Sequence, residues 1–156
     1  MRTWVTILLL LSAADLAHAQ ESAPATNKPP AAVAPRPVVA ATNAPIRVIA
    51  AETLRAMLQS TNDFVLVDVM PRLYFQDFHI KGAMSIPEET VAATVQNWPR
   101  SRRIVVYCLD RECESSRDVA RTLMAMGFAD VLQYEGGKRE WRARKYEAIG
   151  KGRLLD

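Results

Sequence analysis

The chain has 156 residues, of which 49% are hydrophobic and 24% are charged, and its net charge is +3. The length suits one domain with a tail, and the composition is that of an ordinary globular protein. A charge this small and scattered excludes a surface built for nucleic acid. We therefore expect the one basic stretch, residues 138–145, to be a solvated helix face.

The N-terminus has the pattern of a secretory signal peptide, which we assign to residues 1–19. Arg2 supplies a positive charge, residues 5–11 are apolar, and the small residues at 17–19 form a cleavage signal. The apolar run is too short to span a bilayer comfortably, so we expect no stable membrane insertion after cleavage. These features predict a secreted, periplasmic protein.

Residues 20–45 have the composition of a linker. They contain six prolines, with alanines between them and no glycine. Such a chain favours extended conformations, which predicts a semi-rigid spacer without a core of its own. The folded domain is then expected over residues 46–156.

From residue 46 onward, apolar runs alternate with segments of helical periodicity. The apolar runs predict strands at residues 46–49, 64–69, 104–107 and 131–134, and a turn with a brief strand between His79 and Pro87. Helical spacing predicts helices at residues 51–59, 71–78, 88–98 and 115–126, and a last helix that carries Trp141 and Tyr146. This alternation indicates an α/β fold with helices on both faces of a sheet, whose ligands bind beyond the carboxyl ends of the strands.

Cys108 follows the central predicted strand and precedes a helix. Ser115, with Asp118 three residues later, has the pattern of a capping box that opens this helix, and Gly127 should end it. Backbone N–H groups and the helix dipole at such a terminus lower the pKa of a thiol. The sequence therefore nominates Cys108 as a nucleophile.

Cys113 is the only other cysteine of the chain. Exported proteins often hold structural disulfides, but a loop this short gives a disulfide little entropic stabilisation. We therefore expect reversible pairing, in which Cys113 resolves a persulfide or sulfenate on Cys108; a small apolar filler and a permanent disulfide are the alternatives. Because no second Cys/His pair accompanies the two cysteines, we expect no metal site and no cofactor.

The ordered motifs of the chain resemble those of the rhodanese-like domain family. They are Val-Asp-Val at 67–69, His-Ile-Lys-Gly-Ala at 79–83, Ile-Pro at 86–87, Val-Tyr-Cys at 106–108, Gly-Phe at 127–128 and Glu-Gly-Gly at 135–137 with Trp141. The resemblance covers residues 46–146 and implies a small parallel sheet flanked by helices. Enzymes of this family take sulfane sulfur from thiosulfate or a related donor onto a cysteine and pass it to a thiol or cyanide.

By this resemblance, Cys108 is the residue that forms the persulfide. The substrate-binding loop, whose backbone N–H groups would cradle the sulfur, consists of Leu109, Asp110, Arg111, Glu112, Glu114 and Ser115. The supporting residues are Asp68, a buried carboxylate hydrogen-bonded to backbone, Arg117 in the first turn of the helix, and the tight turn at Gly136 and Gly137. His79, the only histidine beyond the signal segment, is expected to be structural.

The loop departs from the usual family pattern. It is longer than usual, and Ser115 stands where an arginine opens the helix in the family. Asp110, Glu112 and Glu114 add negative charge that repels an anionic donor such as thiosulfate, which favours a neutral or protein-bound persulfide. The missing arginine also excludes a cysteine phosphatase, which needs a guanidinium to clamp the phosphoryl oxygens.

The function that these features predict is sulfur transfer through a persulfide on Cys108. The partners would be a small sulfur donor and a thiol acceptor, with protein thiols among the candidates. Two alternatives stay open: a thiol–disulfide redox protein that cycles Cys108 and Cys113, and a non-catalytic binding module. We expect a monomer and no nucleic-acid partner.

Overall fold

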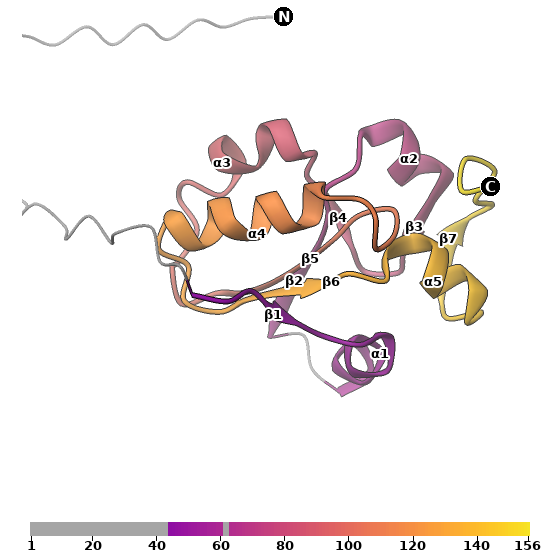
Figure 1. Ribbon diagram of the computed structural model, residues 1–156, viewed down its shortest axis with the longest axis horizontal. Coiled ribbons are helices and arrows are strands. Elements are labelled where there is room, and N and C mark those ends of the chain that lie inside the picture. Colours follow the sequence, from indigo (N-terminus) through magenta and orange to yellow (C-terminus); the bar gives the residue numbers. More distant parts are fainter. Residues whose placement is uncertain (1–43, 61–62) are drawn as a thin grey trace, which may run out of the picture. The chain divides into compact units, whose positions relative to one another are not determined.

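A parallel sheet of five strands lies at the centre of the structure, a computed structural model that describes residues 44–60 and 63–156 (Figure 1). In spatial order its strands are β1 (Arg47–Val48), β6 (Val131–Tyr134), β5 (Arg103–Tyr107), β2 (Phe64–Asp68) and β4 (Met84–Ser85). Beside the sheet, β3 (Phe78–Ile80) and β7 (Ala148–Gly150) form an antiparallel pair. The predicted signal peptide and residues 20–43 of the predicted linker lie outside the described residues.

Helices cover both faces of this sheet, which confirms the predicted α/β fold. Figure 1 shows α3 (Val91–Thr94) and α4 (Ser115–Ala125) on one face and α1 (Ala51–Ser60) on the other. The remaining helical elements are α2 (Arg72–Asp77), the short 3₁₀ helix η1 (Glu88–Thr90) and α5 (Gly137–Ala143). Among the described residues, no helix is long and apolar enough to cross a membrane.

The alternation of side chains along β5 divides the hydrophobic core in two. Ile104 and Val106 are fully buried on the face that α3 and α4 cover, whereas Val105 and Tyr107 are fully buried on the opposite face. Because successive side chains of a strand point to opposite faces, Cys108 falls on the same face as Val106. The pattern that builds the core therefore also directs the Cys108 sulfur toward α4.

The helix predicted at residues 88–98 is shorter in the structure. It consists of η1 and α3 and ends at Thr94, and Val95 leaves the helical conformation with φ −95° and ψ 2°. Threonine and valine have low helix propensity because their branched side chains lose rotamer freedom in a helix. Val91 and Val95 are nevertheless both buried, as their spacing predicts.

The C-terminal part of the domain also differs from the prediction. The last helix ends at Ala143, and Tyr146 lies beyond it, where its ring packs edge-on against Trp141 with centroids 5.0 Å apart. Lys145 has a positive φ of 56°, which turns the chain out of the helix. The strand β7 that follows has only three residues, too few to show a clear period in the sequence.

Lys138 is fully buried, so the expectation of a solvated basic stretch is wrong for this residue. Its Nζ lies 2.9 Å from Oδ2 of Asp68, which is also fully buried. Oδ1 of Asp68 accepts the N–H of Met70 at 3.1 Å, as expected for a buried carboxylate. Burial raises the pKa of Asp68 and lowers the pKa of Lys138, and the attraction between the two charges opposes both shifts.

Replacing Lys138 should destabilise the domain, because Lys138→Met leaves the Asp68 charge buried without its partner. We expect a loss of about 3 kcal/mol in the free energy of unfolding, measured by urea denaturation. The control is Lys81→Met, which removes an exposed ion pair with Glu147 and should leave the free energy nearly unchanged. Equal effects of the two substitutions would contradict a stabilising role of the buried pair.

Candidate active site

Cys108 is the first residue after β5. Hydrogen bonds from the helix α5 hold its backbone in place. The carbonyl oxygens of Cys108 and Leu109 accept the N–H groups of Lys138 and Arg139 at 3.1 and 3.0 Å. Gly137 has a φ of 61°, and a Cβ at this position would lie 2.5 Å from the Leu109 carbonyl group. The glycine turn at 136–137 therefore faces the loop, as predicted, because only glycine allows this close approach.

Asp110 shapes the loop from within. Its Oδ1 accepts the N–H groups of Glu112 and Cys113 at 3.0 and 3.1 Å, and its Oδ2 lies 2.6 Å from a guanidinium nitrogen of Arg139. An aspartate that binds the backbone two and three residues ahead closes a tight turn. This turn leads the chain from Cys108 back to the start of α4, and the Asp110 charge is balanced by Arg139.

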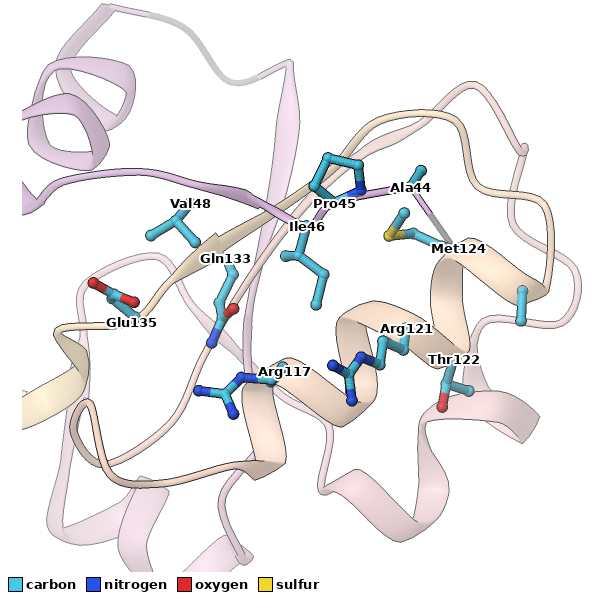
Figure 2. A pocket seen from close by; sticks show the side chains of 11 residues that line it. Ala44, Pro45, Ile46, Val48, Arg117, Arg121, Thr122, Met124, Gln133 and Glu135 are labelled. Carbon is cyan, nitrogen blue, oxygen red and sulfur yellow. The ribbon is translucent and has the colours of Figure 1, made fainter. Parts of the chain in front are cut away.

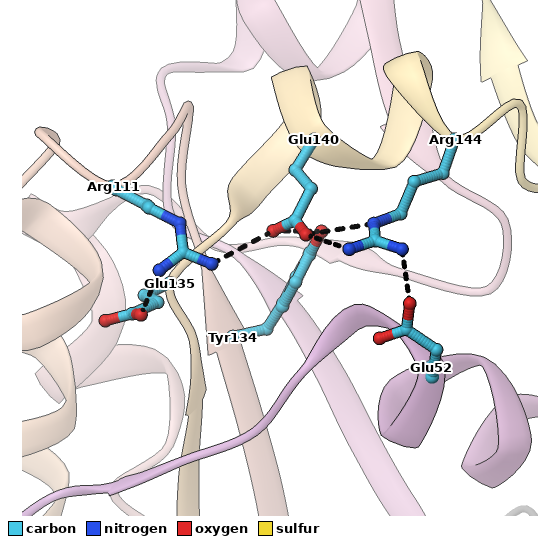
Figure 3. Close-up of polar contacts among 6 residues, drawn as sticks. All are labelled: Glu52, Arg111, Tyr134, Glu135, Glu140 and Arg144. Carbon is cyan, nitrogen blue, oxygen red and sulfur yellow. Dashed lines mark hydrogen bonds and ion pairs between the residues drawn. The ribbon is translucent and has the colours of Figure 1, made fainter.

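Arg111 extends from the loop toward α5 and joins a network of charges (Figure 3). Its guanidinium lies 2.6 Å from Glu135 and 3.7 Å from Glu140. Arg144 binds Glu140 from the other side at 2.7 Å and also pairs with Glu52 of α1. The only arginine between the two cysteines therefore fastens the loop to α5, and its charge is already paired within this network.

Arg117 lies on α4 and pairs with Glu114 at 3.6 Å. Together with Arg121, Ile46 and Met124 it lines a groove of about 680 Å³ between α4 and β1 (Figure 2). Two of the three acidic residues of the loop are thus paired with an arginine, Asp110 with Arg139 and Glu114 with Arg117. The repulsion that the sequence predicts for an anionic donor is correspondingly weaker.

Some hydrogen-bond donors of the loop face the Cys113 sulfur, whereas the N–H groups of Glu112 and Cys113 bind Asp110. The Cys113 sulfur accepts hydrogen bonds from the Cys108 thiol, from the backbone N–H groups of Leu109 and Ser115, and from the Ser115 hydroxyl. These bonds, led by that of the Cys108 thiol, lower the pKa of Cys113 to about 6 despite its partial burial. The sequence predicts a cradle of loop N–H groups around Cys108; the backbone N–H that reaches the Cys108 sulfur is that of Ser116, the residue after the predicted loop.

Cys108 is the proton donor of the cysteine pair. Its thiol is hydrogen-bonded to the Cys113 side chain, and its Sγ also lies 3.2 Å from the Cys113 carbonyl oxygen. This bonding, together with burial, raises the pKa of Cys108 well above that of an ordinary thiol. The pKa of Cys108 in the reduced pair is thus raised and not lowered as the sequence predicts, because the bond to Cys113 and burial outweigh the donors of Ser116.

Ser116 and Gln133 support the Cys108 sulfur, and the sequence interpretation misses both. Ser116 Oγ lies 3.3 Å from Cys108 Sγ and accepts the Gln133 amide N–H at 3.0 Å. Since the Gln133 amide donates to the Ser116 oxygen, the Ser116 hydroxyl proton points at the Cys108 sulfur. The Ser116 backbone N–H also donates to this sulfur. Both bonds favour a negatively charged sulfur on Cys108. In the sequence, the sign of this arrangement is a glutamine within the otherwise apolar strand β6.

The start of α4 differs from the predicted capping box. The helix begins at Ser115 with Glu114 as its N-cap residue, and the Ser115 hydroxyl contacts the Cys113 sulfur instead of capping the helix. Gly127, with φ 88°, follows the C-terminal end of this helix, as predicted. The serine at the helix start therefore serves the cysteine pair.

His79 has a structural environment, as expected. Its Nδ1 donates to the Phe75 carbonyl oxygen at 2.8 Å, and its ring stacks on the Phe75 ring with centroids 3.8 Å apart. Within residues 44–60 and 63–156, no group of three or more His, Cys, Asp or Glu side chains is arranged to hold a metal ion.

The sequence model of the rhodanese-like domain matches residues 50–144, which include both cysteines and the whole loop. This chain belongs to the rhodanese-like domain family. The predicted family and fold are thereby confirmed.

Several curated proteins resemble this rhodanese-like domain. The thiosulfate sulfurtransferase GlpE of Pseudomonas savastanoi is 33% identical over 79 residues, which cover 51% of this chain and 73% of GlpE. A sulfurtransferase of Allochromatium vinosum is 29% identical over 93 residues, covering 60% of this chain and 85% of that protein. The HTH-type transcriptional regulator Rv0324 of Mycobacterium tuberculosis is 34% identical over 92 residues, but the chain spans only 39% of its length.

Solved structures show the same fold. The rhodanese-like domain of the Alr3790 protein from Anabaena sp. superposes with a TM-score of 0.60 at 28% identity, covering 66% of this chain and 78% of that domain. The BH2092 protein from Bacillus halodurans has a TM-score of 0.62 at 22% identity, covering 70% and 81% of the two chains. The second likeness bears on the fold alone.

Alkylation of Cys113 should rise with pH through a midpoint of about 6 and level off above it, because only the thiolate reacts. Cys108→Ala removes the thiol that donates to Cys113, so the midpoint should move up toward the ordinary thiol value of about 8.5. Iodoacetamide labelling across this pH range, followed by peptide mass analysis, measures both midpoints. A wild-type midpoint near that of an ordinary thiol would contradict the lowered pKa of Cys113.

Gln133→Glu should slow the reaction of Cys108, because a carboxylate accepts the Ser116 hydroxyl proton and draws it away from the sulfur. In a Cys113→Ser background, where Cys108 is the only thiol, we expect alkylation about tenfold slower. Gln59→Glu, at an exposed position of α1, is the control for added charge and should have no effect. The same Gln133 substitution should change nothing when Ser116→Ala is already present, and an undiminished effect there would contradict this arrangement.

Proposed function

We propose that this protein is a rhodanese-like sulfurtransferase that carries sulfane sulfur as a persulfide on Cys108. The observation that carries the proposal is the place of Cys108 at the carboxyl end of the central strand β5, with its sulfur 3.3 Å from Ser116 Oγ at the start of α4. Ligands of parallel α/β sheets bind at such strand ends. Relatives that bear the name sulfurtransferase match this domain over 73% and 85% of their own lengths.

In the proposed reaction, the Cys108 sulfur attacks a sulfane sulfur that originates from a small donor. The bond between that sulfur and the group that carried it breaks, and that group keeps the bonding electron pair. The Cys108 proton passes along the existing hydrogen bond to Cys113, which is the thiolate of the pair. A thiol acceptor, with protein thiols among the candidates, then removes the terminal sulfur and restores Cys108.

Ser116 supplies the stabilisation that the reaction needs. Its hydroxyl and backbone N–H both donate to the Cys108 sulfur, and Gln133 orients the hydroxyl. Donors that are held in place before the reaction stabilise a sulfur anion without reorganising. The loop residues 109–115 would then act mainly through the backbone, with Asp110 and Arg111 fixing its shape.

Thiol–disulfide exchange between Cys108 and Cys113 is the second candidate function. It is favoured by the hydrogen bond between the two side chains and by the low pKa of Cys113, and both cysteines are free thiols in the structure. Forming the disulfide would remove two electrons and two protons, which a disulfide-bearing partner would have to accept. A binding module without chemistry is the remaining alternative.

We also propose that the protein acts outside the cytoplasm as a monomer, held on its proline-rich linker. The support is the signal pattern of residues 1–19 and the composition of residues 20–45. Fractionation of cells that express the full chain, together with the mass of the mature protein, tests this proposal. A cytoplasmic protein that keeps residue 1 would contradict it.

The function is tested by turnover with a persulfide donor and a thiol acceptor. We expect sulfur transfer by the wild-type protein and a loss of about a thousandfold or more for Cys108→Ser, because the nucleophile is removed. Intact mass after incubation with the donor should show the gain of one sulfur atom that reductant reverses and that maps to Cys108. Loss of two hydrogens without added sulfur would favour the redox function, and an unchanged mass would favour the binding module.

A further inference from the structure

The two cysteines of the loop differ in their accessibility. Cys108 is fully buried, whereas Cys113 keeps part of its surface exposed. The loop that covers Cys108 is held by α5 through the backbone bonds of Lys138 and Arg139 and through the ion pair between Asp110 and Arg139. A donor molecule therefore meets the Cys113 sulfur at the surface, and it reaches Cys108 only if this fastened loop opens.

The hydrogen bonds of the loop also favour Cys113 as the first nucleophile. The backbone N–H groups of Leu109 and Ser115 and the Ser115 hydroxyl all donate to its sulfur. These donors stabilise a sulfur anion at Cys113 before any substrate arrives, and a thiolate is the reactive form of cysteine. Hydrogen-bond donors therefore face both sulfurs: those of the loop face the half-buried Cys113, and Ser116 faces the buried Cys108.

We propose that sulfane sulfur enters this protein at Cys113 and is then passed to Cys108, so that the two cysteines form an internal relay. The proposal rests on the sulfurtransferase function proposed above and assigns the point at which sulfur enters the site. It gives Cys113 a place in the forward reaction, whereas a resolving cysteine would act only after Cys108 had been modified.

The first step is an exchange at the surface. The Cys113 thiolate attacks the terminal sulfur of a small persulfide, R–S–SH, and a new sulfur–sulfur bond forms on Cys113. The sulfur–sulfur bond of the donor breaks, and R–S⁻ leaves with its electron pair. Cys113 now bears the neutral persulfide –S–SH, whose terminal sulfur is the electrophile of the next step, and no oxidant is consumed.

The second step moves the sulfur inward. The Cys108 sulfur attacks the terminal sulfur of the Cys113 persulfide, and the sulfur–sulfur bond on Cys113 breaks with its electrons left on Cys113 Sγ. The Cys108 proton passes to that Sγ, so the products are Cys108–S–SH and the Cys113 thiol. The step conserves charge, protons and oxidation state, and the new persulfide lies beside the Ser116 hydroxyl that Gln133 orients.

A relay of this kind would load sulfane sulfur onto Cys108, which the donor cannot reach directly. Because Cys108 is fully buried, the persulfide on it would be shielded from water and from oxidants that attack exposed sulfur. The same burial would make Cys113 the exit for sulfur when the second step runs in reverse. The acceptor would then be a thiol that can approach the exposed face of the loop.

The test follows both persulfides in time. The full chain is mixed with cysteine persulfide, quenched at short intervals with an alkylating reagent, and mapped by peptide mass analysis. We expect the Cys113 persulfide to appear first and to decay as the Cys108 persulfide grows. A Cys108 persulfide that forms with no earlier Cys113 persulfide would overturn the relay.

Two substitutions of Cys113 distinguish a sulfur relay from a role of Cys113 as a base alone. Cys113→Ser removes both the sulfur carrier and the base, whereas Cys113→Asp keeps an anionic base that cannot carry sulfur. We expect both to slow the loading of Cys108 by more than about tenfold, and Cys108→Ala to accumulate persulfide on Cys113. Loading of Cys108 in Cys113→Asp at the wild-type rate would overturn the relay and leave the proposed function standing. Failure of the proposed function looks different, because the wild-type protein would then never bear sulfur on Cys108.

Discussion

The buried pair between Asp68 and Lys138 is the constraint on which the cysteine loop depends. Asp68 ends β2 and lies opposite Tyr107, the residue before Cys108 on the neighbouring strand β5. The Lys138 side chain binds Asp68 while its backbone N–H binds the Cys108 carbonyl oxygen. One residue of α5 therefore joins the ends of two strands, and Gly137 lets the helix approach the loop closely enough for this to occur.

This anchoring divides the chemistry of the site between two sulfurs. With the backbone of Cys108 fixed and the Asp110 turn closed, the N–H groups of Leu109 and Ser115 are directed at Cys113. The buried Cys108 receives only the donors of Ser116, and its pKa is raised while that of Cys113 is lowered. A half-buried Cys113 beside a fully buried Cys108 is an arrangement suited to accepting sulfur at the surface and storing it inside.

The fold was predictable from the sequence because apolar runs and ordered short motifs are local signals. These signals predict the strands around β5, the family, and the glycine turn that faces the loop. The features that the sequence does not predict depend on tertiary placement. The local pattern around Lys138 indicates a surface cation, and Gln133 reaches Ser116 only because β6 lies beside β5. The sulfur that each loop donor faces could not be predicted, because sequence spacing gives the length of a turn and not the direction of its N–H groups.

The most direct test of the central claim, that Cys108 carries the sulfur, is a crystal structure of the protein after incubation with a persulfide donor. We expect one additional sulfur atom bonded to Cys108 Sγ, within hydrogen-bond distance of the Ser116 hydroxyl or backbone N–H, with Cys113 restored to a free thiol. A Cys108–Cys113 disulfide, or an additional sulfur found on Cys113 alone after long incubation, would contradict it.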